Sequence, residues 1–117
     1  MWQRRDQDGL TVLTCTADGD SADAVEEAFQ QLQQAIAAEP RRRWVLDVGR
    51  ISRISSLAIA QLIAAVRTVD LAGGRIVLVG AHPFVANVLR TTRIVKVLPL
   101  FDDHAAARAW LDGTEAG

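Results

Sequence analysis

Two short apolar runs restrict the possible fold of this chain more than any other feature. Residues 44–48 read Trp-Val-Leu-Asp-Val and residues 76–79 read Ile-Val-Leu-Val, so both are nearly continuous in apolar side chains. Such runs are typical of strands buried on both faces, as in a parallel sheet covered by helices. Between them, residues 56–71 predict a helix that stops at Gly73 and Gly74, where glycine suits a helix end. The chain therefore predicts an α/β fold.

A second helix is predicted upstream of the first run. Its apolar residues recur at spacings of three and four, as the buried side of a helix requires: Val25, Ala28, Phe29, Leu32 and Ile36. Asp20 or Ser21 is suited to cap its start, and Pro40 ends it. We expect this stripe to pack on the sheet together with the helix that starts at Ser56.

The N-terminal segment predicts a β-hairpin. Residues 2–5 form a short edge strand in this interpretation, and residues 10–15 are rich in residues that favour strands. The Asp8-Gly9 pair between them is a good hairpin turn. The chain thus starts with two antiparallel strands.

The C-terminal segment predicts a helix, a strand and a last helix. Residues 83–91 form the first of these, with proline in its first turn, and residues 97–101 form the strand. Asp102 or Asp103 then caps the final helix. Its expected inward residues are Ala105, Ala106, Ala109 and Trp110. The order is ββαβαβαβα, which implies right-handed crossovers and a mixed sheet of four to five strands with about four helices.

Composition and charge exclude several classes of function. The chain has 117 residues, half of them apolar, which suffices for one modest core, so we expect a single domain over residues 1–117. Thirteen basic residues oppose fourteen acidic ones, so no general attraction to nucleic acid or to an anionic membrane results. The longest apolar run, residues 57–66, is too short to span a bilayer, and the first residues lack the apolar stretch of a secretion signal. With a single cysteine as well, we expect a cytoplasmic protein.

No set of residues has the spacing of a catalytic or metal site. His82, His104 and Cys15 lack ligand spacing to one another, so we expect no metal, no cofactor and no catalysis. Cys15 lies in a predicted strand, where a free cysteine usually behaves as a small buried apolar residue. The basic cluster at residues 41–43 fits a solvated sheet edge better than a nucleic-acid site, because few aromatic residues accompany it.

The most specific pattern lies in residues 45–62. An apolar-Asp-apolar strand end at residues 46–48 leads through a short loop into residues 54–60, which open a helix. This arrangement resembles the hallmark of the STAS domain family, and the glycine, proline and apolar residues further along are similar in order to that family's second half. The resemblance covers about residues 8–112. It implies the STAS fold, of the type found in anti-sigma factor antagonists.

Two serines of this segment are candidate phosphorylation sites. Ser56 matches the serine that a partner kinase phosphorylates in many anti-sigma factor antagonists, while Ser55 stands where that family usually has Asp. Leu57, Ala58 and Ala60 replace the family's hydroxyl residue and glycines. The residues alone also permit a structural interpretation, in which Ser55 is a helix N-cap and Ser56 a first-turn residue.

The resemblance implies a protein-binding surface around this helix start. A phosphate there would interact with free backbone N–H groups and would place charge beside apolar side chains, which would repel an apolar partner. Arginines in the preceding loop either pair with that phosphate or with an acidic partner, or are simply solvated loop residues. The residues expected at this surface are Arg50, Arg53, Ile54, Ser55, Ser56, Leu57, Ile59 and Gln61.

These features predict a non-catalytic regulatory module that binds a protein. The resemblance implies that the partner is a kinase-type anti-sigma factor or a related partner-switching protein, and we expect neither nucleic-acid binding nor membrane insertion. The alternative is an accessory subunit of a lipid or anion transport system, because STAS proteins also serve in such systems.

Overall fold

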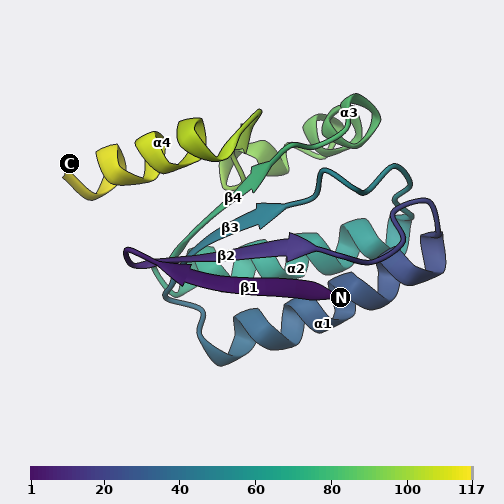
Figure 1. Ribbon diagram of the computed structural model, residues 1–117, viewed down its shortest axis with the longest axis horizontal. Coiled ribbons are helices and arrows are strands. Elements are labelled where there is room, and N and C mark those ends of the chain that lie inside the picture. The colour runs from purple at the N-terminus through teal and green to yellow at the C-terminus, as the bar shows by residue number, and fades with distance from the viewer. Residues whose placement is uncertain (117) are drawn as a thin grey trace.

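Five strands form one mixed sheet in the spatial order β1-β2-β3-β4-β5 (Figure 1). The computed structural model describes the backbone of residues 1–116 and the surroundings of side chains 1–113. The strands are β1 (Trp2–Gln7), β2 (Leu10–Cys15), β3 (Arg43–Asp47), β4 (Arg75–Val79) and β5 (Leu100–Phe101). The β1–β2 pair is antiparallel, whereas β2–β3, β3–β4 and β4–β5 are parallel. The expected α/β fold with a mixed sheet is confirmed.

The N-terminal hairpin follows from its turn residues. Asp8 and Gly9 both have positive φ angles, 51° and 80°. This is the backbone of a type I′ turn, for which Asp-Gly is a favoured pair. The turn sets the register in which Gln7 pairs with Leu10, so β1 extends two residues beyond the predicted strand.

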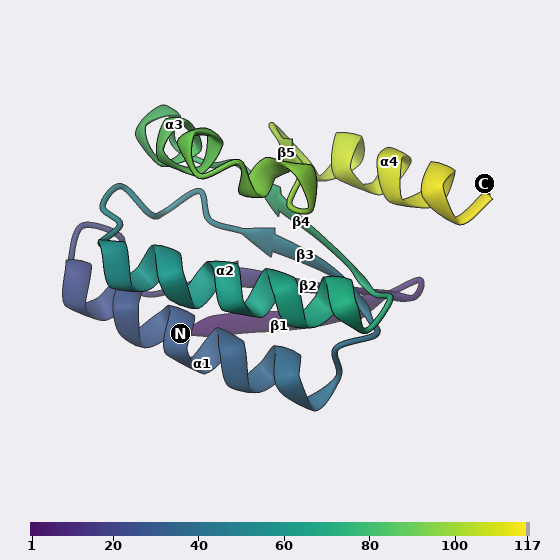
Figure 2. The ribbon, with the colours of Figure 1, turned by 180° about the vertical axis from the view of Figure 1, so that it is seen from behind.

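Helices cover both faces of the sheet unequally. They are α1 (Ala22–Ala38), α2 (Ser56–Leu71), α3 (Pro83–Thr91), the short 3-10 helix η1 (Ile94–Lys96) and α4 (His104–Ala116). Helices α1 and α2 lie side by side on one face, and α4 lies on the other, in both the front view (Figure 1) and the view from behind (Figure 2). The order ββαβαβαβα is confirmed, with η1 as an addition before β5.

The structure decides between the alternative capping residues. Ser21 caps α1, because its hydroxyl accepts the backbone N–H of Ala24 at 3.2 Å. Asp103 caps α4, because its carboxylate accepts the N–H of Ala106 at 2.8 Å. Each cap satisfies one of the N–H groups that lack a partner in the first turn of a helix.

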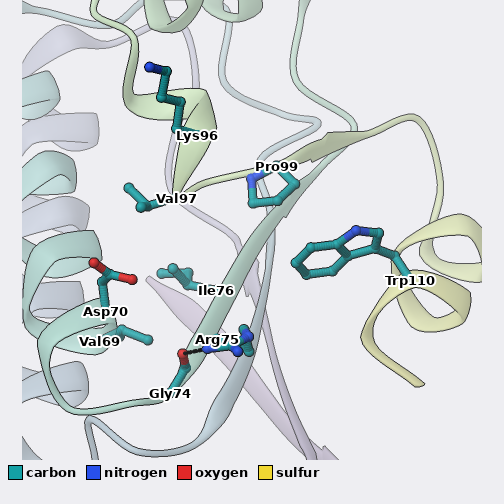
Figure 3. Close-up of a pocket in the computed structure, with 9 residues that line it drawn as sticks. All are labelled: Val69, Asp70, Gly74, Arg75, Ile76, Lys96, Val97, Pro99 and Trp110. Carbon is teal, nitrogen blue, oxygen red and sulfur yellow. Dashed lines mark hydrogen bonds between the residues drawn. The ribbon is translucent and has the colours of Figure 1, made fainter. Parts of the chain in front are cut away.

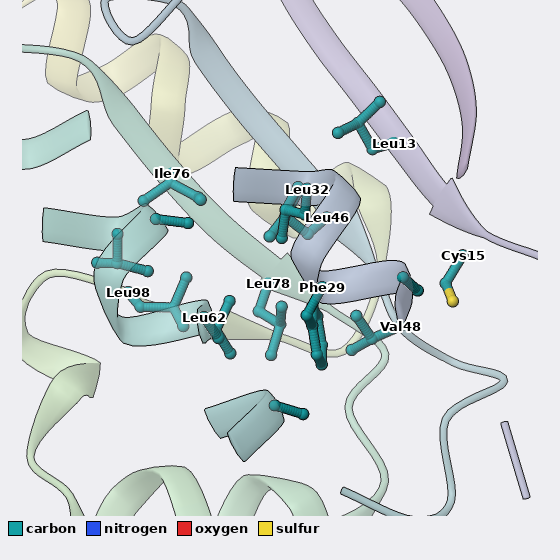
Figure 4. Packing of buried hydrophobic residues seen from close by; sticks show 14 of the residues in the cluster. Leu13, Cys15, Phe29, Leu32, Leu46, Val48, Leu62, Ile76, Leu78 and Leu98 are labelled. Atoms are coloured by element: carbon teal, nitrogen blue, oxygen red, sulfur yellow. The ribbon is translucent and has the colours of Figure 1, made fainter. Parts of the chain in front are cut away.

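The main core lies between the sheet and the α1–α2 pair (Figure 4). The predicted stripe of α1 is buried in full, with Phe29 only 1% exposed. Alternate residues of the strands meet this stripe, among them Leu46 and Leu78. Cys15 belongs to the same core, and burial raises the pKa of its thiol, so it stays protonated and packs as a small apolar side chain.

The predicted last strand is wrong in its length. Strand β5 has only two residues, and η1 occupies part of the segment before it. Pro99 has no N–H to donate to a neighbouring strand. In addition, Arg93 turns the chain with a positive φ of 61° just before η1.

The predicted inward side of α4 is also wrong. The residues expected to face inward were Ala105, Ala106, Ala109 and Trp110, and all four are exposed. Ala107 and Leu111 are buried instead, against Val45 and Val77 of the sheet. Because consecutive alanines carry little periodic signal, apolar spacing could not determine which side of α4 faces the sheet.

Trp44 offers a test of the core. Its ring is fully buried, yet its indole N–H has no hydrogen-bond partner among the described residues. An unpaired buried donor costs about 1–3 kcal/mol. In Trp44→Phe the removal of this cost offsets the lost packing volume, so we expect the free energy of unfolding to change by less than about 1 kcal/mol.

Urea unfolding is the measurement, and Trp44→Ala is the comparison variant. The alanine variant should lose about 3–5 kcal/mol because it leaves a large cavity. If Trp44→Phe lost as much as Trp44→Ala, the indole N–H would have to be paired in solution.

Candidate functional site

The candidate site lies at the carboxyl edge of the parallel strands, where α2 begins (Figure 1). Residues 48–55 connect β3 to α2, and residues 16–21 connect the neighbouring strand β2 to α1. The C=O of Gly19 accepts the backbone N–H of Ser52 at 3.0 Å and that of Arg53 at 3.1 Å. The two loops are therefore bonded to each other beside the helix start.

The close approach of these loops depends on Gly19. A Cβ atom at this position would lie 1.6 Å from the carbonyl oxygen of Arg50, far inside van der Waals contact. The hydroxyl of Ser52 also donates a hydrogen bond to the carboxylate of Asp20. Because any side chain at residue 19 would force the loops apart, Gly19 determines where the loop before α2 lies.

Ser55 is the N-cap of α2, and its hydroxyl both accepts and donates a hydrogen bond. The oxygen accepts the backbone N–H of Ala58 at 3.1 Å, and the O–H donates to Oε1 of Glu26 at 2.5 Å. The side chain is half-buried between α1 and α2. A phosphate at this position would break the cap contact and would lie against the Glu26 carboxylate, which repels it.

Ser56 is the first residue of α2 and differs from its neighbour. It is exposed, and within the described part of the chain its hydroxyl has no hydrogen bond. It sits in the first turn, where backbone N–H groups have no acceptor inside the helix and favour a nearby anion. The geometry therefore makes Ser56 the accessible hydroxyl and Ser55 the structural one.

The residues predicted for the binding surface lie in the loop before α2 and in the first two turns of this helix. The exposed ones are Arg50, Arg53, Ser56 and Leu57, and the half-buried ones are Ile54, Ser55, Ile59 and Gln61. Leu57 is 55% exposed, which is unusual for a large apolar side chain in a helix. The amide oxygen of Gln61 is buried and has no partner among the described residues, so this side chain lies partly beneath the surface.

The loop before α2 carries two exposed arginines. Neither Arg50 nor Arg53 forms a salt bridge with another described residue, and both are exposed. Their guanidinium groups are thus available to a phosphate or a carboxylate. The first turn of α2 offers backbone N–H groups to an anion, and the exposed side chain of Leu57 offers an apolar contact to a partner.

Asp47 connects the end of β3 to α4. Its Oδ1 accepts the backbone N–H of Gly49 at 3.0 Å, and its Oδ2 lies 2.7 Å from Nε2 of His104, the first residue of α4. The apolar-Asp-apolar pattern therefore has a structural role here, because the aspartate orders both the loop that leads to α2 and the start of the last helix.

Four residues that matter at this site were not expected there from the sequence, although Asp20 was a candidate cap for α1. They are Gly19, Asp20, Glu26 and Ser52. Gly19 and Asp20 belong to the loop that follows β2, so the parallel arrangement of β2 and β3 would have been enough to bring that loop to this edge. Glu26 is separated from Ser55 by 29 positions, and no spacing rule connects them.

Among the residues that the structure describes, no group of three or more histidine, cysteine, aspartate or glutamate residues is placed to hold a metal ion. No helix in that part is both long and apolar enough to cross a membrane.

The Ser55–Glu26 contact predicts the effect of the aspartate that the STAS pattern has at this position. Ser55→Asp keeps a good capping residue but places a second carboxylate against Glu26, so we expect a loss of about 1 kcal/mol in unfolding free energy. Glu26→Gln in the same chain should restore most of it. The measurement is a double-mutant cycle by urea unfolding, with an expected coupling of about 1 kcal/mol. A loss that persists when Glu26 is neutralised would contradict the contact.

Comparisons with known proteins agree with this fold. The chain matches the model of the STAS domain over residues 1–107. No curated protein sequence is significantly similar to it. An anti-sigma-factor antagonist (STAS) domain protein from Planctomyces limnophilus is 21% identical, with 91% of this chain and 93% of that chain covered and a TM-score of 0.76.

Two other solved structures share the fold at lower identity. The phosphorylated form of the Bacillus cell fate determinant SpoIIAA is 16% identical, with 95% of this chain and 99% of that chain covered and a TM-score of 0.68. The murine anion transporter Slc26a9 is also 16% identical, with 93% of this chain but only 18% of that chain covered and a TM-score of 0.72. Since the family model covers most of the sequence, the chain belongs to the STAS domain family.

Proposed function

We propose that this protein is a non-catalytic, cytoplasmic regulator of the anti-sigma factor antagonist type, which docks on a kinase-type anti-sigma factor through the start of α2. Phosphorylation of Ser56 switches the docking off. Proteins described as anti-sigma factor antagonists, and SpoIIAA in its phosphorylated form, share this fold. The observation that carries the proposal is the free, exposed hydroxyl of Ser56 beside Ser55, whose hydroxyl is already bonded as donor and as acceptor.

A phosphate on Ser56 is stabilised by groups of this chain but weakens the binding of a partner. Free N–H groups of the first helical turn and the guanidinium groups of Arg50 and Arg53 stabilise it within this chain. Toward a partner, it adds a charge of about −1.5 to −2 beside the exposed side chain of Leu57. A partner that buries Leu57 must then desolvate that charge, so its affinity falls.

Two substitutions at Ser56 test this switch. Ser56→Ala should leave stability within about 0.5 kcal/mol, because no hydrogen bond is lost, and should keep partner binding while preventing phosphorylation. Ser56→Glu should weaken binding about tenfold or more, because a carboxylate brings charge to the docking surface. Isothermal titration of each variant against the anti-sigma kinase of the host, with mass spectrometry after kinase treatment, measures both effects.

Ser55→Ala is the matched control one residue away. It should lose about 1 kcal/mol of stability with the helix cap and should still be phosphorylated at Ser56. Phosphate on Ser55 instead would contradict Ser56 as the switch. Equal affinities of wild type, Ser56→Ala and Ser56→Glu would contradict docking through the start of α2.

The same experiment addresses the transport alternative. A STAS fold occurs in Slc26a9, which makes a subunit of a transport system the second candidate. A transport ATPase or permease that binds this chain with an affinity insensitive to charge at Ser56 would favour that role over the switch.

A further inference from the structure

Strand β1 forms an open edge of the sheet. It pairs with β2 on one side over its whole length without a bulge, and no described strand lies on its other side. Residues 3–7 of this strand are all exposed. The β5 side of the sheet differs, because Ile76 of β4 is only 2% exposed and Val97 and Pro99 lie beside it (Figure 3). The β1 edge is therefore the more accessible of the two.

The pairing of β1 with β2 determines which of its backbone groups face outward. The C=O of Met1 accepts the N–H of Thr16 at 2.7 Å, and Gln7 is the last paired residue before the two-residue turn. Because bonded residues alternate along an antiparallel strand, every second residue between these two faces away from β2. The outward-facing residues are Trp2, Arg4 and Asp6. Their outward N–H and C=O groups have no hydrogen bond to any other described residue, so they form a template for another extended chain.

The charged side chains of this edge are complementary to those of a second copy of the same strand. Arg4 and Asp6 lie on the same side of β1, and their side chains are 39% and 54% exposed. In antiparallel pairing about a two-fold axis at Arg5, Arg4 of each copy lies opposite Asp6 of the other. This register also places outward-facing residues opposite each other, as their hydrogen bonds require. A shift of two residues would oppose Arg4 to Arg4 or Asp6 to Asp6 instead.

Helix α1 holds the edge strand in its extended form. The indole N–H of Trp2 donates to the C=O of Ala28 at 2.6 Å, and Nη2 of Arg4 donates to Oε2 of Glu39 at 2.8 Å. A strand that is already ordered loses little conformational entropy when it pairs. Neither a proline nor a bulge interrupts β1, although edge strands commonly use both to avoid pairing.

We propose that β1 is a self-association edge, through which two copies of this chain pair antiparallel and join their five-stranded sheets into one. Each main chain supplies the donors and acceptors that Arg4 and Asp6 of the other lack. Arg5 meets its own copy on the opposite face of the sheet, and this like-charge contact keeps the dimer weak, with a Kd near about 0.1 mM. The proposal is independent of the switch at Ser56, because β1 contacts α1 rather than the start of α2.

Sedimentation velocity of the full chain, from about 10 µM to about 1 mM, measures the association. The sedimentation coefficient should rise from that of a monomer to that of a dimer. Two neighbouring substitutions should act in opposite directions. Asp6→Asn removes both ion pairs and should weaken the dimer about fivefold, whereas Arg5→Thr removes the like-charge contact and should tighten it about fivefold. Ser56→Glu should leave the Kd unchanged, and circular dichroism checks that each variant is folded.

Disulfide formation tests the register of the pairing. Opposed residues that are not hydrogen-bonded have Cα atoms about 4.5 Å apart, within the range of a disulfide, so Arg5→Cys should cross-link to its own copy in oxidised glutathione. Gln3→Cys, exposed on the same face, is the matched control. It lies opposite residue 7 of the second copy, so its own copy is about 14 Å away, and it should cross-link only when mixed with Gln7→Cys. The buried Cys15 should not cross-link in the wild type.

Hydrogen exchange of the wild type supplies an independent measurement. The amides of Arg4 and Asp6 should exchange about threefold more slowly at about 1 mM than at about 10 µM, whereas the amide of Arg5, which faces β2, should be slow at both concentrations. A chain that stays monomeric at the highest concentration, association that leaves the Arg4 amide unchanged, or equal cross-linking of Arg5→Cys and Gln3→Cys would each overturn the proposal.

Discussion

Gly19→Ala should lower the unfolding free energy by about 3 kcal/mol, because the added methyl group would overlap backbone and break hydrogen bonds. The carbonyl oxygen of Arg50 would lie 1.6 Å from the new Cβ, so a small side-chain rotation cannot relieve the clash. Separation of the two loops would also remove the bonds from Ser52 and Arg53 to the C=O of Gly19. Thermal unfolding should show a decrease of about 10 °C in Tm.

Gly113→Ala is the matched control for this change. Residue 113 lies in α4, and a Cβ there would meet nothing within 4 Å. Because alanine favours a helix over glycine, this variant should be unchanged or more stable by up to about 1 kcal/mol. If Gly19→Ala were as stable as Gly113→Ala, the loop before α2 would have to be free to move, and the position of Arg50 would not depend on Gly19.

The strands and helices that the sequence predicted well are those with a strong periodic signal. Helix α1 combines five buried apolar residues at helical spacing with a proline after its end, and the stripe is buried as expected. Strands β3 and β4 are short apolar runs in the middle of the sheet, where burial on both faces leaves little choice of residue. For these elements, local pattern and tertiary packing favour the same structure.

The C-terminal part was harder to predict because its local preferences are weak. Residues 97–101 favour a strand by composition, yet only two of them pair, since Pro99 interrupts the donors on that side. The inward side of α4 depends on which alanine meets Val45 and Val77, and nothing in an alanine-rich segment distinguishes the candidates. Tertiary packing determined both outcomes.

At the candidate site, the sequence predicted the segment and offered Ser55 as a possible N-cap, but it left phosphorylation open for both serines. The distinction comes from Glu26 on the neighbouring helix α1. Its carboxylate accepts the hydrogen bond that the hydroxyl of Ser55 donates. A contact between distant positions of the chain has no local signature, which is why the environment of each serine required the structure.

Phe29→Ala should be still more damaging than the glycine variant, with a loss of about 3–5 kcal/mol. The ring is 1% exposed in the main core, and its centroid lies 5.9 Å from that of Trp2, so the strand β1 loses a contact as well. Truncation leaves a cavity that the neighbouring helix and strands fill only in part. Such a loss is a large fraction of the stability of a domain of this size.

The effect should also reach the site, because Phe29 follows Glu26 by one helical turn. Looser packing of α1 weakens the hold of Glu26 on the hydroxyl of Ser55, and the amide of Ala58, which the Ser55 cap protects, should exchange faster. Gln30→Ala, at the exposed neighbouring position, should change the unfolding free energy by less than about 0.5 kcal/mol and leave that exchange unaltered. Urea unfolding and hydrogen exchange measure the two effects; equal losses in both variants would mean that the α1 stripe does not face the sheet.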